Sequence, residues 1–561
     1  MKKLMSILLI ACIVLITACG PIGSTTDPAA SPESPGASPA SPGASSASPG
    51  ASSTSPNATP ANPGASPDHP GASPAPTDEG VKFAEHIEII LDNMAPAAVN
   101  PFSPAGSSVG SNWTYRMIYD TLIYPLGNGE YAPLLATQWE TQDFQTYVFN
   151  LRDDVYFHNG DNVTANDVAF TVNVLSKEFV GTPGANRWSA AETATATDKY
   201  TVEIVLKSVN VDFLYEISTS QAGIFSEKEY QENPDEWAYM GSGPFILKGF
   251  TSNDSIELER NDNYWGDIPV TKSVTMRYIP EMAARLMMLQ NNEADACFAI
   301  TPEDVPAIEA NPDFEVYWLK LNNPHLLGFN LDDPIVGDLN FRLAVAHALY
   351  REDIAIVSGG DGGVPVTDGS TFGYDQEFRN WDVPLRPYDP DLAREYLAAS
   401  VYNGEEIEIA AAIPTLILGL PVIQQQLADV GIKTRINQMD IPGLGAYAAY
   451  GNNQCQIIYY VPNLGHGVAS IQTLYLPGGN MNRMSFNDPY VTELLTRAQT
   501  IGDYNERREL YMGLQEYLNE EPAMVGTYWH ANPLVFRKGI GGMKLRTDDL
   551  HDLRGIYLII D

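Results

Sequence analysis

The side chains best suited to nucleophilic or metal chemistry, cysteine and histidine, are few and scattered in this chain of 561 residues. The eight histidines lie at positions 69, 86, 158, 325, 347, 466, 530 and 551. No HExxH, CxxC or Walker motif occurs, so the usual zinc, redox and phosphate-binding patterns are missing. The glycine-rich stretch 359–363 lacks the Lys-Ser/Thr ending of a phosphate loop, and we expect a flexible loop after a helix that ends near Val357. The sequence therefore predicts a protein that is not an enzyme and that uses no metal or cofactor.

One cysteine stands where a covalent modification is expected. Two lysines at positions 2 and 3 and an apolar run from residue 4 to residue 16 precede it, and such a run suits a signal peptide and is short for a membrane span. The segment Ile16-Thr17-Ala18-Cys19-Gly20 resembles the lipobox of bacterial lipoproteins. We therefore predict a signal peptide at 1–18 and a lipid on Cys19, with acyl chains that anchor the chain stably. The body is expected at the extracellular face of the bacterial cell membrane.

Residues 19–80 form a low-complexity segment of Pro, Ala, Ser, Gly and Thr. Pro-Gly-Ala-Ser recurs with starts at 35, 42, 49, 63 and 70, and the repeat lacks the Leu, Ile and Val that a coiled coil needs. Such a segment cannot bury enough apolar surface to offset its ordering entropy. We expect a disordered tether that reaches between roughly 45 Å as a coil and about 190 Å when extended.

The charge and the remaining cysteines describe the body. The formal net charge is −38, and the tether has no Lys or Arg, so the acidity belongs to the body. An acidic surface argues against nucleic acid and against direct binding to anionic lipid. Cys297 and Cys455 lie in apolar, strand-like runs, which favours buried free thiols over a disulfide.

The body alternates between short strand and helix patterns. Residues 146–152 alternate with period two, as a half-buried strand does. Asp389-Pro390 and Asp488-Pro489 each place a capping carboxylate before a proline, which predicts two helix starts. A capping box at 164–167 predicts a third start, and a helix is expected at 420–430 before a strand at 432–436. This mixture predicts an α/β body of two or three domains.

Several longer motifs occur in a fixed order along the body. They are the stretches 132–140, 155–160, 164–168, 241–245, 258–266, 328–330, 341–349, 350–354 and 388–390. Together they resemble the family 5 extracellular solute-binding proteins, the peptide, nickel and oligosaccharide binders of ABC importers.

The resemblance implies a type II periplasmic-binding-protein fold, bilobal with an extra inserted domain. Ligand is expected in the cleft between domains I and III, which two crossovers join near 313–325 and 520–530. The lobes would close over it and present it to an ABC permease and ATPase complex, and we expect a monomer. The implied boundaries are 81–119, 239–312 and 525–561 for domain I, 120–238 for domain II and 313–524 for domain III.

The resemblance also implies where a ligand binds. Peptide binders of this family usually carry Trp-x-x-Asp-Tyr late in domain III, with the aspartate on the peptide amine. Here Tyr460 and Asn463 fall at the tryptophan and aspartate positions, so the amine's partner becomes neutral. This favours an oligosaccharide, on which Tyr459 and Tyr460 could stack, and leaves an oligopeptide open. A nickel chelate would need a cleft histidine, and His466 and His530 are the candidates.

Other cleft candidates come from loops near the domain edges and the crossovers. These residues are Asn112, Trp113, Phe372, Tyr374, Trp529 and His530. A surface sensor or adhesion module of the same fold, without transport, is the alternative that the sequence leaves open.

Overall fold

The computed structural model describes residues 81–91, 98–106, 108–127, 129–298, 300–462 and 467–560. The predictions for the signal peptide, Cys19 and the tether lie outside these residues, as do those for Asn463 and His466. No helix in the described part is both long and apolar enough to cross a membrane. We use domains I, II and III as names for the residue ranges given above.

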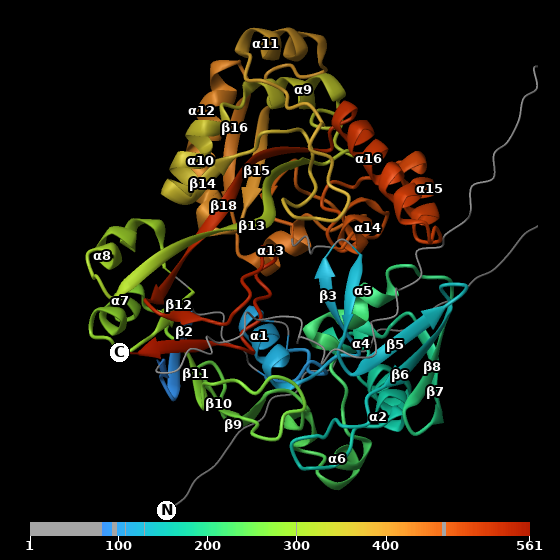
Figure 1. The fold of residues 1–561 in the computed structure, drawn as a ribbon. Coiled ribbons are helices and arrows are strands. Elements are labelled where there is room, and N and C mark those ends of the chain that lie inside the picture. The colour runs from blue at the N-terminus through green and yellow to red at the C-terminus, as the bar shows by residue number, and fades with distance from the viewer. Residues whose placement is uncertain are drawn as a thin grey trace, which may run out of the picture. The chain divides into compact units, whose positions relative to one another are not determined.

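Within the described residues, eleven strands form one large sheet that continues from domain I into domain III (Figure 1). The strand order is β16-β15-β17-β13-β18-β12-β2-β11-β10-β9, and β14 pairs with β18. The long antiparallel pair β13 and β18 links the two halves, and parallel pairing occurs on both sides of it. The strands are β2 (His86–Leu91), β9 (Phe245–Thr251), β10 (Ser255–Arg260), β11 (Ser273–Tyr278), β12 (Ala296–Cys297), β13 (Phe314–Phe329), β14 (Gly363–Pro365), β15 (Glu406–Ala411), β16 (Lys433–Gln438), β17 (Ile457–Tyr460) and β18 (Met524–Arg537).

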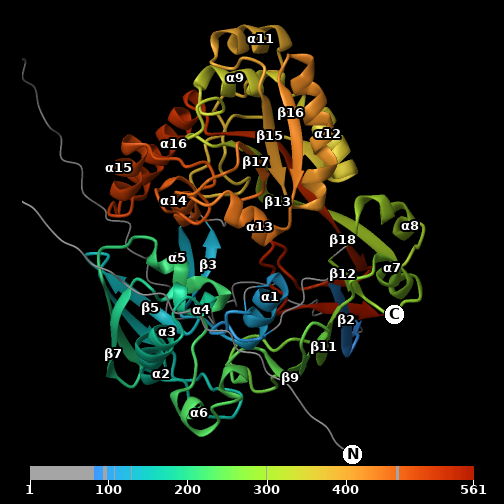
Figure 2. The same cartoon turned by 180° about the vertical axis from the view of Figure 1, so that it is seen from behind.

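Helices cover both faces of the domain III half of the sheet, as the two opposite views show (Figures 1 and 2). Because successive side chains of a strand point to opposite faces, Ile457 and Ile458 of β17 enter two different hydrophobic clusters. Both faces of the strand are therefore buried. The helices are α9 (Leu339–Ala348), α10 (Arg351–Gly359), α11 (Pro390–Ala399), α12 (Pro414–Asp429), α13 (Ile441–Tyr447), α14 (Ala469–Tyr475), α15 (Pro489–Ala498) and α16 (Tyr504–Glu520).

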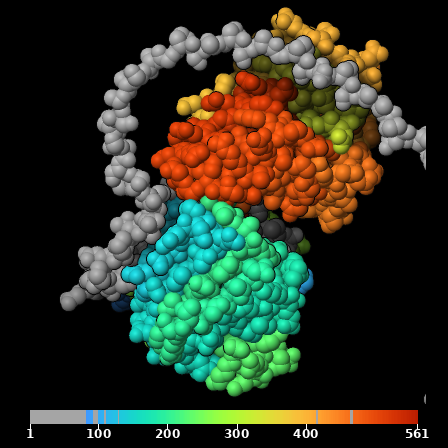
Figure 3. Space-filling view, turned by 90° about the vertical axis from the view of Figure 1, so that its right-hand side faces the viewer, coloured from blue at the N-terminus to red at the C-terminus, as the bar shows by residue number. Residues whose placement is uncertain are grey.

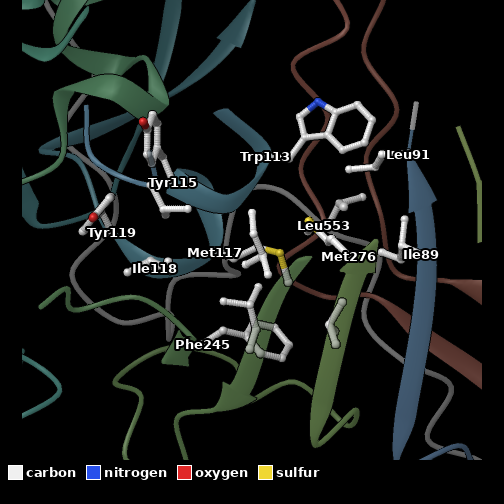
Figure 4. Close-up of a cluster of buried hydrophobic side chains, with 14 of the residues drawn as sticks. Ile89, Leu91, Trp113, Tyr115, Met117, Ile118, Tyr119, Phe245, Met276 and Leu553 are labelled. Atoms are coloured by element: carbon white, nitrogen blue, oxygen red, sulfur yellow. The ribbon is translucent and has the colours of Figure 1, made fainter. Parts of the chain in front are cut away.

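In domain I, helix α1 (Val109–Ile118) packs on the other half of the sheet. Met117 lies among Ile89 and Met276 in a fully buried cluster (Figure 4). Two further helices, α7 (Met282–Gln290) and α8 (Val305–Glu309), help to enclose a second cluster around Cys297. A small three-stranded sheet joins the start and end of the body through β1 (Lys82–Phe83), β19 (Ile540–Gly541) and β20 (Tyr557–Ile560).

Domain II has a separate four-stranded sheet in the order β5-β6-β8-β7 and a two-stranded hairpin of β3 and β4. The alternating 146–151 segment becomes β6, with Tyr147 and Phe149 completely buried. The strands are β3 (Ile123–Gly127), β4 (Glu130–Pro133), β5 (Ala136–Thr141), β6 (Thr146–Leu151), β7 (Ala191–Asp198) and β8 (Thr201–Leu206). The helices are α2 (Ala165–Phe170), α3 (Ser176–Glu178), α4 (Pro183–Arg187), α5 (Phe213–Ser218) and α6 (Glu227–Glu232), with a π-helical stretch Thr171–Leu175 between α2 and α3.

The α/β class and most local predictions are confirmed. Asp389 and Asp488 cap α11 and α15, and the capping box at Thr164 opens α2. Cys297 and Cys455 are buried, and no disulfide joins them.

Two local predictions are wrong. Helix α12 begins at Pro414 rather than near residue 420, so Pro421 lies inside the helix. Helix α10 extends through Gly359, and the glycine-rich stretch forms a 3₁₀ turn and strand β14 instead of a flexible loop, because β14 pairs with β18.

Candidate functional site

A cavity of about 210 Å³ lies where all three domains meet. From domain II, hairpin β3–β4 and Tyr215 line the cavity. From domain III, the loop that follows Phe372 lines it, together with Gly467. The C-terminal segment lines it from domain I. The lining residues are Pro125, Leu126, Gly127, Gly129, Glu130, Tyr131, Tyr215, Asp375, Glu377, Gly467, Lys544, Leu545, Arg546 and Thr547.

The domain II and domain III residues of this cavity are in direct contact. A Cβ atom at Gly467 would come within 2.9 Å of the Tyr215 ring, and one at Gly129 would come within 3.2 Å of a Glu377 carboxylate oxygen. Gly129 adopts φ +73° at the hairpin turn, a backbone conformation that costs glycine little. In the space-filling view, the cyan and green residues of domain II abut the red residues of domain III (Figure 3). Domains II and III therefore meet at the edge of the cavity.

Two carboxylates reach the cavity from one loop of domain III. Asp375 and Glu377 line it, whereas Phe378 of the same loop enters the hydrophobic core. The buried Arg379 holds the loop, because it donates hydrogen bonds of 2.7 and 2.9 Å to the two carboxylate oxygens of Asp368. Both bonds come from one guanidinium nitrogen, Nη2, and charge-assisted bonds of this kind are strong, so the loop that presents the two acids is held at its base.

Glu377 is set to change its charge near neutral pH. Burial raises the pKa of its carboxyl to about 7, and the neighbouring Arg507 lowers it in part. Arg507 of α16 also forms an ion pair with Asp212 of domain II, and both side chains are largely buried. A backbone hydrogen bond of 3.3 Å from Val211 to the carbonyl of Gln499 lies beside this pair. Arg507 thus connects a cavity residue to the contact between domains II and III.

Two cations reach the same cavity from the C-terminal segment. Arg546 donates hydrogen bonds of 3.0 and 2.7 Å to the carboxylate of Asp548, which holds its guanidinium in place. Lys544 also lines the cavity and is only partly buried. Thr547 donates a 3.3 Å hydrogen bond to Asp375, which ties this segment to the acidic loop. The cavity therefore offers partners to a positive and to a negative group of one ligand.

Three of the predicted ligand contacts are completely or almost completely buried in the core of domain III. Tyr459 is 0% exposed, and its hydroxyl lies 3.0 Å from the hydroxyl of Thr527. Tyr460 is 8% exposed, and its hydroxyl lies against the sulfur of Met524. Phe372 is 0% exposed and belongs to the same cluster as Tyr460. Their surroundings are those of packing residues, and none of the three lines the cavity.

The predicted ligand contacts Asn112 and Trp113 of domain I also form contacts within the protein. Trp113 is 2% exposed and donates a 2.6 Å hydrogen bond to the carbonyl of Asp549. Asn112 is largely buried and donates to the carbonyl of Ser108 at 3.0 Å. Neither residue lines the cavity.

The predicted residues beside the crossovers form a group of their own. The ring of Tyr374 lies 5.6 Å from that of Trp529, and the ammonium of Lys320 lies 4.1 Å from the Tyr374 ring centre. His530 is largely buried, and its ring lies 6.1 Å from that of His325. Within the described residues, no three histidine, cysteine or acidic side chains gather as a metal site.

Sequence reasoning missed the residues that line the cavity, although two signals pointed to them. Asp375 and Glu377 directly follow the predicted pair Phe372 and Tyr374, and they alternate with residues that enter the core. The second signal is a basic cluster near the C-terminus, Lys544 and Arg546, in a chain of net charge −38.

Comparison with known proteins identifies the class of the chain. The profile described as "Bacterial extracellular solute-binding proteins, family 5 Middle" matches residues 130–482, which is more than half of the chain. The glutathione-binding protein GsiB of Escherichia coli (strain K12) is 24% identical over 465 residues, covering 77% of this chain and 88% of GsiB. The di/tripeptide-binding protein 2 of Pseudomonas aeruginosa (strain UCBPP-PA14) is 23% identical over 516 residues, covering 82% of this chain and 93% of that protein.

The fold agrees with this. A putative peptide binding protein, AppA from Clostridium difficile, superposes with a TM-score of 0.76 at 20% identity, covering 84% of this chain and 100% of AppA. The fold is thus that of a bilobal periplasmic binding protein, as the sequence predicted. The chain belongs to the family 5 bacterial extracellular solute-binding proteins.

Proposed function

We propose that this protein is a lipid-anchored substrate-binding protein that captures a short peptide in the cavity and delivers it to an ABC importer. The observation that carries the proposal is the cavity itself, which is lined by the carboxylates of Asp375 and Glu377 and by the cations Lys544 and Arg546. A peptide with a free amine and a free carboxylate has the matching charges. The two relatives above, named for binding glutathione and di- or tripeptides, support the same ligand class.

The acidic loop removes the main argument for a sugar ligand. A sugar ligand is favoured only if Asn463 is the neutral replacement for an aspartate that would bind the amine. Asp375 and Glu377 supply carboxylates from another loop, and a charge-assisted bond from an amine to a carboxylate is about twice as strong as a neutral one. The cavity volume of about 210 Å³ lies below the 300–1,000 Å³ of drug-sized sites, which favours a ligand of a few residues.

Export, anchoring and delivery complete the proposal. Cys19 would carry the lipid and residues 19–80 would act as the tether, so that the body works outside the cell membrane. The energy for transport would come from the partner permease and ATPase, and binding requires no chemistry from this chain. Closure of the lobes over the cavity would exclude water from the ligand, which would strengthen polar contacts inside it.

The test is a thermal-shift assay on the purified full-length protein. The panel contains free tripeptides, the same tripeptides with an acetylated amine, neutral oligosaccharides, and Ni²⁺ with and without histidine. A ligand at about one hundred times its Kd adds roughly 2.7 kcal/mol to the stability of the folded state.

Each outcome of this assay is decisive. Free tripeptides should raise the melting temperature and their acetylated forms should not. A shift with oligosaccharides alone would overturn peptide capture in favour of sugar import, and a shift with the nickel–histidine chelate alone would point to metal uptake.

A further inference from the structure

Three cations surround one tyrosine behind the side of the cavity that Lys544 and Arg546 line. Tyr124, on hairpin β3–β4, is 1% exposed. The guanidinium carbons of Arg116 and Arg554 lie 5.2 and 5.0 Å from its ring centre. The ammonium of Lys544 lies 5.4 Å from the same centre. Because cations gathered around one ring repel one another, a cluster of this kind needs compensating negative charge.

Carboxylates compensate only part of this charge. Arg554 is held by Asp552, with hydrogen bonds of 3.0 and 2.6 Å to its two carboxylate oxygens. Arg546 is held in the same way by Asp548. Neither Arg116 nor Lys544 forms an ion pair with any residue that the structure describes.

Arg116 and its neighbour Tyr124 are also short of hydrogen bonds. One guanidinium nitrogen of Arg116, Nη2, donates to the carbonyl of Ser218 at 3.2 Å. Its other terminal nitrogen, Nη1, and the hydroxyl of Tyr124 are buried without a hydrogen-bond partner among the described residues. Burial lowers the pKa of Arg116 to about 10, with Tyr124 and Arg554 acting in opposite directions, so Arg116 stays charged at neutral pH. Buried polar groups without partners are rare in native proteins and call for an explanation.

Lys544 places positive charge at the cavity. It lines the cavity, whereas Arg116 and Tyr124 lie behind the cavity wall. We propose that Lys544, backed by Arg116 across the Tyr124 ring, forms the subsite for the carboxylate of the bound ligand. This inference rests on the proposed function and deepens it, since it selects peptides that carry a free carboxylate.

The subsite would also set specificity. A ligand without an anionic group would enclose the ammonium of Lys544 with no counter-charge when the domains close, and a desolvated charge without a partner is costly. Sites built around a buried polar group reject analogues that lack its partner far more strongly than apolar pockets reject a missing methylene. Neutral sugars and amidated peptides should therefore bind poorly.

The test combines three tripeptide libraries with variants of one lysine, again in the full-length protein. The first library has neutral side chains and a free carboxylate, the second is the same library as C-terminal amides, and the third is an amide library with one Asp or Glu. The variants are Lys544→Met, which keeps the apolar stem, and Lys544→Arg, which keeps the charge. Lys199→Met is the matched control, because Lys199 lies 4.8 Å above the ring of Tyr200 and is exposed on domain II.

The expected result is a charge-dependent loss. The wild-type protein and the Lys199→Met and Lys544→Arg variants should bind the free-acid library, and Lys544→Met should bind it about tenfold to a hundredfold more weakly. The wild-type protein should bind the amide library poorly. If the third library restores binding and this binding depends on Lys544, the bound carboxylate belongs to a side chain of the peptide. If the third library does not restore binding, the bound carboxylate is that of the C-terminus.

Two results would overturn the subsite, and they differ in what they leave standing. In the first result, the wild-type protein binds the acid and amide libraries with equal affinity, and Lys544→Met binds them as tightly as Lys199→Met does. This result would remove the subsite and leave peptide capture intact. No response to any library would remove the proposed function and the subsite together. If Lys544→Met does not fold, the wild-type comparison of acids with amides and the Lys544→Arg variant still decide.

Discussion

At the scale of single residues, Glu377 connects the cavity to the pH of the medium. Its pKa is raised by burial from 4.5 to about 7, so the folded protein holds this proton more tightly than the unfolded chain does. The stability that this proton contributes is fully present below about pH 4.5 and is lost as the pH rises through about 7. A ligand amine at the cavity would favour the charged carboxylate and release the proton.

We expect Glu377→Gln to remove this pH dependence, because an amide resembles the protonated acid and cannot ionise. The variant should melt at the same temperature as the wild-type protein near pH 4.5 and above it at pH 8. Melting curves between these pH values measure the difference. Glu130→Gln, an exposed residue on the same cavity, is the control. Parallel pH profiles for all three proteins would contradict the assignment.

Tyr459 tests whether a residue predicted to touch ligand instead supports the core. Its hydroxyl lies 3.0 Å from that of Thr527 in a fully buried setting. Tyr459→Phe should lower the free energy of unfolding by about 1 kcal/mol and leave tripeptide affinity unchanged. Denaturant unfolding and ligand titration measure the two effects. A loss of affinity with unchanged stability would restore the ligand-contact prediction.

At the scale of elements, side-chain caps decide where helices begin. Asp389 accepts a 3.0 Å hydrogen bond from the backbone of Leu392 at the start of α11, and Pro390 follows it. This satisfies an amide that the helix leaves without a partner. The pattern was readable in the sequence because the cap and the proline are neighbours.

We expect Asp389→Ala to cost about 1 kcal/mol of stability. Asp391→Ala is the matched control, because Asp391 lies on the same helix with a 94% exposed side chain paired to Arg394. Surface changes of that kind usually stay within about 0.5 kcal/mol. Equal losses in the two variants, measured by denaturant unfolding, would refute the capping role.

At the scale of the whole body, one buried ion pair joins domains II and III. Arg507 and Asp212 have side chains that are only 9% and 13% exposed, and Arg507 also lowers the pKa of the cavity residue Glu377. Breaking a buried pair leaves an uncompensated charge, which is far costlier than losing a surface pair. The pair therefore connects the contact between domains II and III to the cavity.

A double-mutant cycle measures that coupling. Arg507→Met and Asp212→Asn should each weaken tripeptide binding by about tenfold or more, because the binding-competent closed form becomes less populated. The double variant should lose less than the sum of the two. The exposed pair Arg497 and Glu506, mutated in the same way, is the control. Additive losses would show that the pair has no role in closure.

The α/β class, the family and many of the local elements could be predicted from the sequence. The local signals are capping aspartates, prolines at the first helical position and period-two alternation. They act between near neighbours in the chain, so they can be recognised without knowledge of the tertiary structure. Helix α12 shows the limit of such local signals, because the pattern predicts a helix from Leu420 with Pro421 in its first turn, whereas the helix begins at Pro414.

The set of residues that line the cavity follows from the tertiary structure alone. Period two places Tyr459 and Tyr460 on opposite faces of β17, but it cannot show that packed helices bury both faces. The cavity brings together 125–131, 375–377 and 544–547, segments far apart in the chain, whose proximity depends on domain packing. Charge pairing between such segments follows from where the fold places them, and no local pattern in the sequence encodes it.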